Sequence, residues 1–538
     1  MRELSTSAPA GGAGARGGDR DSGLRLAELV AAFSLACDLG LGQPMEHVLR
    51  SWLIAGRLAA RLGLGDEQRG SLYYVVTLAW VGCVADAPVV AAVFGDDIGY
   101  RGATYNLDMA GLPALGLMLR RVGTGRPPLQ RFRMAANLIA TGGKAIEEGI
   151  KSHCLTTAQM AHRLGLGAEV CDPLMHVFTR WDGKGVPREV SGEEIALATR
   201  LFHLADVAEV YHRAAGAEAA VEVVRARRGS HFDPSLVDVF CEVAAEVLGD
   251  PAAESDWQEL VASEPTLQRR LTEGDLDAAL QAVADFTDLR SPSRAGHSRG
   301  VAALAADAAA AAGLPAADVK AVWRAGLLHD IGLHGISTAI LDKPGPLSSS
   351  EWERMRMNTY YTERVLARPP ILARLGAIAA LTHERSDGSG YHRGLSGPAI
   401  PLSGRLLGAA CAFRAMTEPR PYRAAINPKQ AVAQLRADVR AGRLDAAAVD
   451  AVLSAAGQSQ GKRRSGPAGL TPREVEVLIL IARGASNRLA ARQLNLTEKT
   501  VGTYVERIYT KTGASTRSTA TLFAMQQGLL ETLEPLDL

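Results

Sequence analysis

An internal repeat constrains the fold of this chain more than any other feature of its sequence. Residues 180–206 and 385–411 align without a gap at an offset of 205, around a shared Asp-Gly-x-Gly core. Upstream of these segments the offset is 250, because His47 matches His297. The difference between the two offsets means that the first copy holds about 45 extra residues, which we expect within 95–150. Chance similarity of two alanine-rich segments is the alternative, and the ungapped agreement argues against it. The positions that recur are Arg180, Asp182, Gly183, Gly185, Arg188, Ser191, Gly192, Ile195, Leu197, Arg200, Leu201 and Ala205.

The spacing of the apolar residues predicts an all-α fold with several domains. After residue 23, apolar positions recur three and four residues apart, and no long run alternates with period two. A chain of 538 residues exceeds one hydrophobic core, and its 47% apolar content excludes a mostly disordered protein. We expect a disordered leader (1–22), a first helical domain (23–250), a helical connector (251–290), a second helical domain (291–456), a flexible linker (457–469) and a small C-terminal domain (470–530).

Cysteine usage and the apolar runs favour a cytoplasmic protein without a membrane segment. The six cysteines are scattered with no Cys-x-x-Cys pair, which is typical of buried thiols in a reducing compartment. The longest uncharged run, residues 71–85, is too short to cross a bilayer. The N-terminus lacks the apolar centre of a signal peptide.

The charge is distributed unevenly along the chain. The net charge is +1, but residues 462–520 contain eleven Lys or Arg against four acidic residues, a net of +7. The tail, 521–538, contributes −3, which leaves −3 for residues 1–461. A short basic segment after a mildly acidic chain indicates a nucleic-acid-binding domain at the C-terminal end.

The C-terminal domain is expected to form four short helices. Thr471 caps the first, and Thr497 caps the third, which runs to about Thr512. On that third helix the apolar residues lie on one face, opposite a polar face with basic flanks. A solvated surface helix is the alternative for this helix taken alone. As a reader of the DNA major groove it would present Lys499, Thr500, Thr503, Glu506, Arg507 and Lys511.

The motifs of this domain resemble those of the LuxR-type helix-turn-helix family. They are LTPRE, the turn GASNRLAARQL, the helix start TEKTV and the helix end IYTKTGASTR, which together span some 60 residues. The resemblance implies binding to double-stranded DNA as a homodimer, with the final helix, about 516–529, as a candidate dimer face. Within this picture Thr503 and Glu506 reach base edges, while the basic residues contact phosphates.

The second repeat copy resembles the HD-GYP phosphohydrolases over residues 280–425. The motifs GHS, HDIG, LDKPGPLSSSEW, THERSDGSGY and MTEPRPYR occur in the order of that family. The resemblance implies a helical domain that holds two or three metal ions and hydrolyses cyclic di-GMP. The ligand positions that this copy retains are His297, His329, Asp330 and His383.

Several substitutions in the second copy remove expected metal ligands. Asn358 and Thr382 stand where the family has His, and Cys411 replaces an Asp. Leu333 replaces a Lys that follows HDIG, and GYP has become Gly390-Tyr391-His392. Too few ligands remain for a bridged metal pair, so we expect at most one divalent ion, bound weakly.

The first copy has lost more of the pattern. Trp80 and Phe178 stand at ligand positions, and only His47, His153 and Asp206 persist. The bulky aromatic side chains are expected to fill the place where ligands would meet. This copy is therefore predicted to be structural.

Two functions follow from the sequence, and they remain alternatives at this stage. The first is a DNA-binding transcription regulator whose tandem HD-GYP-like module senses a nucleotide or other small molecule, or mediates dimerisation, with little or no hydrolysis. The second is an active metal-dependent phosphohydrolase coupled to a DNA-binding domain. A protein-interaction scaffold is a further reading of the same module. The missing ligands favour the first.

Overall fold

The computed structural model describes residues 21–249, 265–458 and 467–530, and it confirms the expected helical architecture. The described residues include one small antiparallel sheet, in which β1 (Asp21–Arg25) pairs with β2 (Arg270–Thr272). Residues 1–20 of the expected leader lie outside the described residues, whereas its last two residues belong to β1, which leads directly into the first helix. Most of the expected linker, residues 459–466, lies outside the described residues.

The first repeat copy contains the helices up to residue 248. They are α1 (Leu26–Leu41), α2 (His47–Arg61), α3 (Asp66–Leu78), α4 (Cys83–Phe94), α5 (Asp97–Thr104), α6 (Gly111–Arg121), α7 (Pro128–Ala140), α8 (Lys144–Arg163), α9 (Ala168–Leu174), α10 (Leu197–Ala215), α11 (Ala217–Ala226) and α12 (Pro234–Leu248).

The second copy and the C-terminal domain follow. The second copy holds α14 (Glu273–Asp288), the 3₁₀ turn η3 (Pro292–Arg294), α15 (His297–Ala311), α16 (Ala316–Leu328), the 3₁₀ turn η4 (Ile331–Gly335), α17 (Thr338–Leu341), α18 (Ser349–Leu366), α19 (Pro370–Ala379), α20 (Leu402–Thr417), α21 (Pro428–Arg440) and α22 (Ala446–Gln458). The C-terminal domain comprises α23 (Pro472–Ala482), α24 (Asn487–Gln493), α25 (Glu498–Thr512) and α26 (Arg517–Gln526).

The helix boundaries reproduce the offsets of the sequence repeat. Helices α2 and α15 begin 250 residues apart, at His47 and His297, and α10 and α20 begin 205 residues apart. Between these matched segments the first copy has α5, α6 and α7, where its extra residues were expected. The described part of the expected connector contains α14, whose buried residues pack on α15 and α16. Helix α14 thus packs on the second copy, while its buried apolar side chains belong to a cluster that extends into the first copy.

Short polar signals fix the starts of the helices that carry the candidate sites. The Ser348 hydroxyl accepts a hydrogen bond from the Glu351 amide at the start of α18, and Thr272 does the same for Asp275 in α14. Helix α15 begins after Gly296, whose φ of 78° suits glycine. A Cβ atom at Gly296 would also lie 2.9 Å from Leu530 Cβ, so this turn packs closely against the C-terminal domain.

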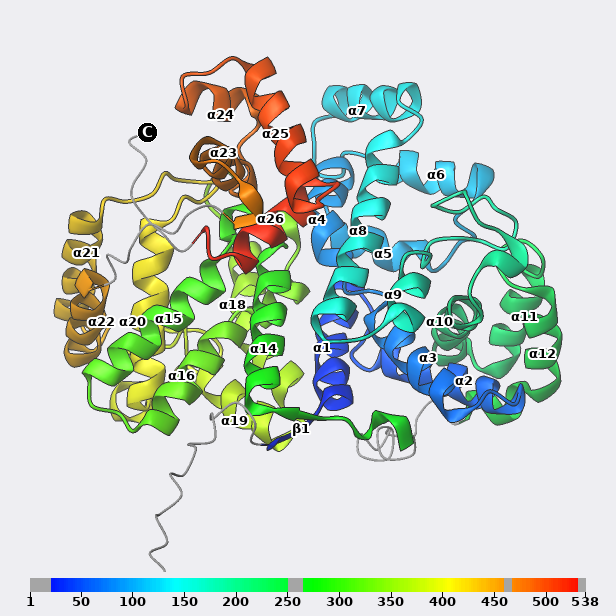
Figure 1. Ribbon diagram of the computed structural model, residues 1–538, viewed down its shortest axis with the longest axis horizontal. Coiled ribbons are helices and arrows are strands. Elements are labelled where there is room, and N and C mark those ends of the chain that lie inside the picture. Colours follow the sequence, from blue (N-terminus) through cyan, green and yellow to red (C-terminus); the bar gives the residue numbers. More distant parts are fainter. Residues whose placement is uncertain (1–20, 250–264, 459–466, 531–538) are drawn as a thin grey trace, which may run out of the picture.

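The two copies lie side by side, and the C-terminal domain covers part of the boundary between them (Figure 1). Helix α1 contacts η4 and α18 of the second copy, while α14 contacts α4 and α8 of the first. Helix α26 contacts both α8 and α14. One cluster of buried apolar residues runs through the first copy, α14 and the C-terminal domain, and a second lies within the second copy.

A buried ion pair joins the copies. Arg290 is fully buried, and its Nη2 lies 2.9 Å from Asp97 Oδ2 in the first copy. The Asp97 carboxylate also accepts hydrogen bonds from the Ser337 hydroxyl and the Thr338 amide at the start of α17. Burial raises the pKa of Asp97, but Arg290 and Arg101 outweigh it and hold the pKa below its usual value.

One helical stretch of the described residues, Asp66–Phe94, has the length and apolar composition of a membrane span. It comprises α3 and α4, which are separated by a turn at residues 79–82. Most of its side chains are buried inside the first copy, as in the core helices of water-soluble domains.

We expect Asp97→Ala to destabilise the protein strongly, because it leaves the Arg290 guanidinium buried without a counter-charge. The expected loss in the free energy of unfolding is about 3–5 kcal/mol. Asp238→Ala is the matched control, since Asp238 pairs with Arg228 at the exposed surface and its loss should change stability far less. Urea unfolding measures both. Equal small effects would contradict a structural role for the buried pair.

Candidate functional sites

Five ligand positions of the second copy converge from four parts of its fold. His297 opens α15, His329 and Asp330 follow α16, and Asn358 lies on α18. Cys411 lies on α20, and all five side chains are buried. The turn after Asp330 packs so tightly on α18 that a Cβ atom at Gly332 would lie 2.0 Å from the Asn358 carbonyl oxygen. Glycine in the HDIG motif is therefore a requirement of packing.

Two neutral histidines face each other in this site. His329 Nδ1 donates to the Gly326 carbonyl at 2.7 Å, so its Nε2 lone pair points towards Asp330 Oδ2, 3.1 Å away. His297 places Nε2 at 3.8 Å from Asp330 Oδ2 and 4.0 Å from Cys411 Sγ. Burial lowers the pKa of His329 to about 3 and that of His297 well below its usual value.

Arg294 supplies a cation to the Asp330 carboxylate. Its guanidinium forms an ion pair with Asp330 Oδ2, while the Asn358 side-chain amide donates to Asp330 Oδ1 at 2.9 Å. In the only carboxylate among the retained ligands, Oδ1 therefore accepts a hydrogen bond from the chain and Oδ2 is ion-paired with the chain's own guanidinium. A bridging carboxylate needs these oxygens for metal ions, so the arrangement does not fit a bridged metal pair.

At the remaining ligand positions of the second copy, the side chains are engaged within the chain or protonated, which also argues against a bridged metal pair. Thr382 donates its hydroxyl to the Ala379 carbonyl at 2.7 Å. His383 stacks on Tyr391, with ring centroids 4.4 Å apart. Burial raises the pKa of the Cys411 thiol, so it is protonated at neutral pH.

A smaller group of possible ligands remains. The ligand atoms of His297, His329 and Cys411 lie within 4.8 Å of one another, and this geometry fits a single ion that accepts nitrogen and sulfur. The sequence predicts His297, His329, Asp330 and His383 as ligands and treats Cys411 as a lost ligand. The structure groups His297 and His329 with Cys411, and Asp330 and His383 are not part of this group.

Two further residues shape the site and were not singled out by sequence reasoning. Glu418 Oε2 lies 2.6 Å from His297 Nδ1, and Arg414 and Arg420 pair with the same carboxylate. Burial raises the pKa of Glu418, but the hydrogen bond from His297 and the charges of Arg414 and Arg420 outweigh it and hold the pKa well below its usual value. Glu418 lies in the MTEPRPYR motif, which could have pointed to it, whereas Arg294 belongs to no motif.

In the first copy, a tryptophan fills the corresponding place. Trp80 Nε1 donates to Asp206 Oδ1 at 2.9 Å, and His47 Nε2 lies 3.1 Å from the same oxygen. Burial lowers the pKa of His47, but Asp206 and Glu209 outweigh it and raise the pKa to about 10. The indole of Trp80 packs against the rings of Tyr105, His153, Phe178 and Phe202.

A second group of possible ligands in the first copy is Cys83, Asp86 and His153, whose ligand atoms also lie within 4.8 Å of one another. Arg101 forms an ion pair with Asp86 and donates to the Cys83 carbonyl at 2.9 Å. As at Asp330 in the second copy, an arginine of the chain supplies the cation that the carboxylate requires.

Helix α25 presents the face expected of a DNA reader. Val501 and Ile508 are buried in the C-terminal domain, and Thr497 caps the helix by accepting from the Thr500 amide. Thr500 is half-buried at this cap. The side chains exposed on the outer face are Lys499, Thr503, Glu506 and Arg507.

Lys511 has a different environment from the other candidate DNA contacts. Its Nζ lies 2.7 Å from Glu474 Oε2 and donates to the Gly469 carbonyl at 3.1 Å. Glu474 is buried and also accepts from the Thr471 amide in the capping box of α23. Lys511 therefore ties α25 to the start of α23.

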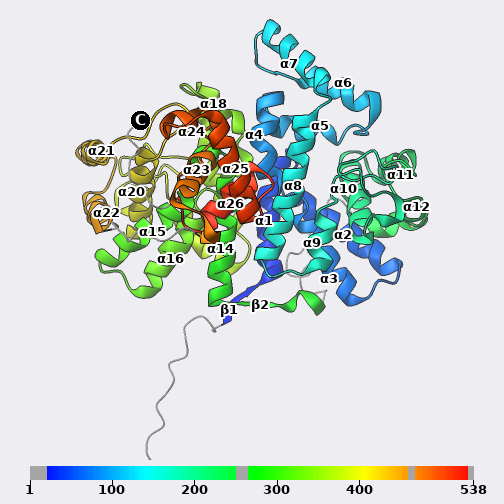
Figure 2. The same ribbon diagram turned by 45° about the horizontal axis from the view of Figure 1, so that its top comes forward.

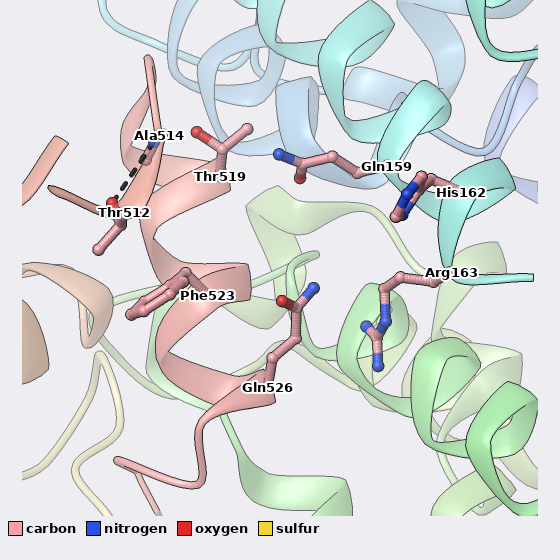
Figure 3. Close-up of a pocket in the computed structure, with 8 residues that line it drawn as sticks. All are labelled: Gln159, His162, Arg163, Thr512, Ala514, Thr519, Phe523 and Gln526. Atoms are coloured by element: carbon pink, nitrogen blue, oxygen red, sulfur yellow. Dashed lines mark hydrogen bonds between the residues drawn. The ribbon is translucent and has the colours of Figure 1, made fainter. Parts of the chain in front are cut away.

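The C-terminal domain is packed on the repeat copies through α26, the expected dimer helix. The Ser518 hydroxyl donates to the Ala85 carbonyl at 3.3 Å, and the hydroxyls of Ser152 and Thr516 lie 3.4 Å apart. A cavity of about 170 Å³ lies between α8 and α26 (Figure 3). It is lined by Gln159, His162, Arg163, Thr512, Ala514, Thr519, Phe523 and Gln526.

Comparisons with known proteins agree with both parts of the molecule. Residues 133–236 and 281–448 match the family described as "HD domain", and residues 468–524 match "Bacterial regulatory proteins, luxR family". The chain is 31% identical over 418 residues to "3'3'-cGAMP-specific phosphodiesterase 3" of Vibrio cholerae, an alignment that covers 76% of this chain and 90% of the relative.

Two other similarities concern single domains and the fold. A "Cyclic di-GMP phosphodiesterase" of Thermotoga maritima is 41% identical over 153 residues, which is 28% of this chain and 40% of the relative. The crystal structure of a cyclic GMP-AMP-specific phosphodiesterase of V. cholerae superposes with a TM-score of 0.57 at 26% identity. That alignment covers 81% of this chain and 98% of the solved chain.

We expect Lys499→Ala and Lys511→Ala to have different effects. The exposed Lys499 should contribute one phosphate contact, so its loss should weaken binding to all DNA sequences and reduce the salt slope by about 1. Loss of Lys511 should instead lower the melting temperature, because the buried Glu474 carboxylate loses its cation. Fluorescence anisotropy at several salt concentrations and calorimetry separate the two. A stable Lys511→Ala protein with uniformly weaker DNA binding would contradict the structural role.

Proposed function

Because the chain belongs to the HD domain family and ends in a luxR-family domain, we propose that it is a DNA-binding transcription regulator whose HD module senses a nucleotide. In this proposal the second copy binds its ligand with little or no hydrolysis, and the first copy is structural. The protein acts in the cytoplasm, without a membrane segment, and binds double-stranded DNA as a homodimer.

The observation that carries the proposal is the engagement of Asp330. In a metal-dependent phosphohydrolase the metal ions neutralise phosphate charge and generate the attacking hydroxide. Here the cation beside Asp330 is the guanidinium of Arg294, which has no bound water to ionise. The Asn358 amide holds the second oxygen. These contacts favour binding of the nucleotide over its hydrolysis.

A single metal ion remains compatible with the site. His297 and His329 are neutral and could ligate with nitrogen, and Cys411 could ligate after losing its proton. Such a set favours zinc over harder ions. Because the buried thiol must ionise first, we propose that this ion binds weakly at neutral pH.

The ligand class is suggested by the relatives. Those reported above are named for hydrolysis of 3'3'-cGAMP or cyclic di-GMP, and the first of them aligns with 76% of this chain. We propose a cyclic dinucleotide as the ligand of the second copy. The basic groups Arg294 and Arg385 near the buried histidines could offset its phosphate charge.

The signal can reach the DNA-binding domain through the turn that carries Arg294. On one side of this turn Arg294 contacts Asp330, and on the other Pro292 contacts Gly484 of the C-terminal domain. A Cβ atom on Gly484 would lie 2.8 Å from Pro292 Cβ, so a shift of the turn would disturb this contact. A ligand that moves Arg294 could therefore alter how the DNA-binding domain is held.

An active phosphohydrolase coupled to DNA binding is the second candidate. The convergence of His297, His329 and Cys411, together with the names of the relatives, favours it. It requires catalysis with fewer ligands than a bridged pair needs, and with Arg294 displaced from Asp330.

Hydrolysis and metal content of the full-length protein test the choice between the two. We expect less than one tightly bound transition ion per chain by mass spectrometry, and no measurable hydrolysis of 3'3'-cGAMP or cyclic di-GMP with Mn²⁺. Turnover by the unaltered protein that disappears in His329→Ala would establish the enzyme and overturn the proposal.

A matched pair of variants tests whether Arg294 prevents metal ions from binding to Asp330. The triple variant Asn358→His, Thr382→His and Cys411→Asp replaces the missing ligands but keeps Arg294 beside Asp330. Adding Arg294→Ala removes the internal cation. We expect two bound ions and hydrolysis only in the quadruple variant. Equal activity in the triple variant would show that Arg294 does not compete with the metal.

A further inference from the structure

Two helices of the first copy expose large apolar side chains to solvent. Helices α6 and α7 stand apart from the rest of the molecule at one end (Figure 2). The exposed fractions are 82% for Leu112 on α6, and 64%, 72% and 61% for Leu129, Phe132 and Ile139 on α7. Apolar patches of this kind on a water-soluble domain mark surfaces that are covered by a partner.

The exposed residues of α7 form one stripe. At 100° per residue, Leu129, Phe132, Ala136 and Ile139 fall within an arc of about 80°. The side that faces the molecule is separate, and it carries the buried Leu138. Helix α7 therefore has two apolar faces, of which the described residues cover only one. Leu112 and Leu115 form a shorter exposed stripe on α6.

The charge of residues 109–146, which include α6 and α7, indicates the charge expected of the partner surface. Residues 109–146 contain six Arg or Lys and no Asp or Glu. The described residues of the two copies outside this segment (21–108, 147–249 and 265–458) carry a net charge of −5. A basic apolar segment on an acidic body is complementary to the body of another molecule of the same chain, whereas two such segments would repel each other.

The repeated fold does not require this segment. It belongs to the extra residues of the first copy, and the second copy completes its helical core without a counterpart. Helix α26, the expected dimer helix, is packed on α8 and α14. A dimer of the molecule in this arrangement needs a contact surface elsewhere.

We infer that the arm formed by α6 and α7 is where a second copy of this chain docks, with each arm lying on the acidic body of the other molecule. The inference rests on the dimeric DNA binding proposed above and gives the dimer its contact surface. Burial of the α7 stripe supplies the apolar centre of the interface, and the arginines around it supply a charged rim. The reciprocal contact buries the stripe twice in one symmetric dimer.

The test is the oligomeric state of the full-length protein by sedimentation velocity. The double variant Leu129→Asp and Phe132→Asp should weaken the dimer at least about tenfold, because charged groups replace the apolar centre of the contact. The control is Gln130→Asp with Asn137→Asp, which adds the same charge to exposed positions of α7 outside the stripe. The control should remain dimeric, and circular dichroism should show equal helicity in both variants.

The outcomes separate this inference from the proposed function. A dimer that persists in the stripe variant overturns the arm as the interface and leaves dimeric DNA binding intact. A wild-type protein that is monomeric with and without DNA overturns both the arm and the dimer. Binding of the monomeric wild type to phosphatidylglycerol vesicles, lost in the stripe variant, would overturn the inference in favour of an anionic membrane surface.

Discussion

The proposed function depends on the ion pair between Arg294 and Asp330. A buried carboxylate in a metallohydrolase needs a cation, and here the chain provides that cation from the turn before α15. The same solution occurs in the first copy, where Arg101 pairs with Asp86. In the function proposed above, these internal cations take the place of metal ions, and the scaffold serves for ligand binding rather than catalysis.

Polar and apolar contacts join the two repeat copies. Arg290 and Asp97 form a buried pair between the copies, and α26 packs on α8 of one copy and α14 of the other. The turn that bears Arg294 lies between the candidate ligand site and the C-terminal domain. A change at the site therefore has a short physical route to the DNA-binding domain, through Pro292 and Gly484.

Much of this architecture could be predicted from the sequence because it depends on local and repeated signals. The helical periodicity, the caps at Thr471 and Thr497 and the constant offsets of the repeat are all confirmed in the fold. The details of the sites could not be predicted in this way. Arg294 and Glu418 reach the ligands through tertiary contacts, and Lys511, a predicted phosphate contact, also pairs with Glu474. Such pairings depend on which buried charges meet in three dimensions.

The most direct test of the account is equilibrium binding of labelled operator DNA by the full-length protein, with and without a cyclic dinucleotide. The operator would first be selected from random DNA fragments, and the nucleotide would be recovered afterwards and analysed by chromatography. We expect the nucleotide to change the DNA affinity by about fivefold or more and to be recovered intact. A nucleotide that is consumed while the DNA affinity stays the same would contradict this expectation.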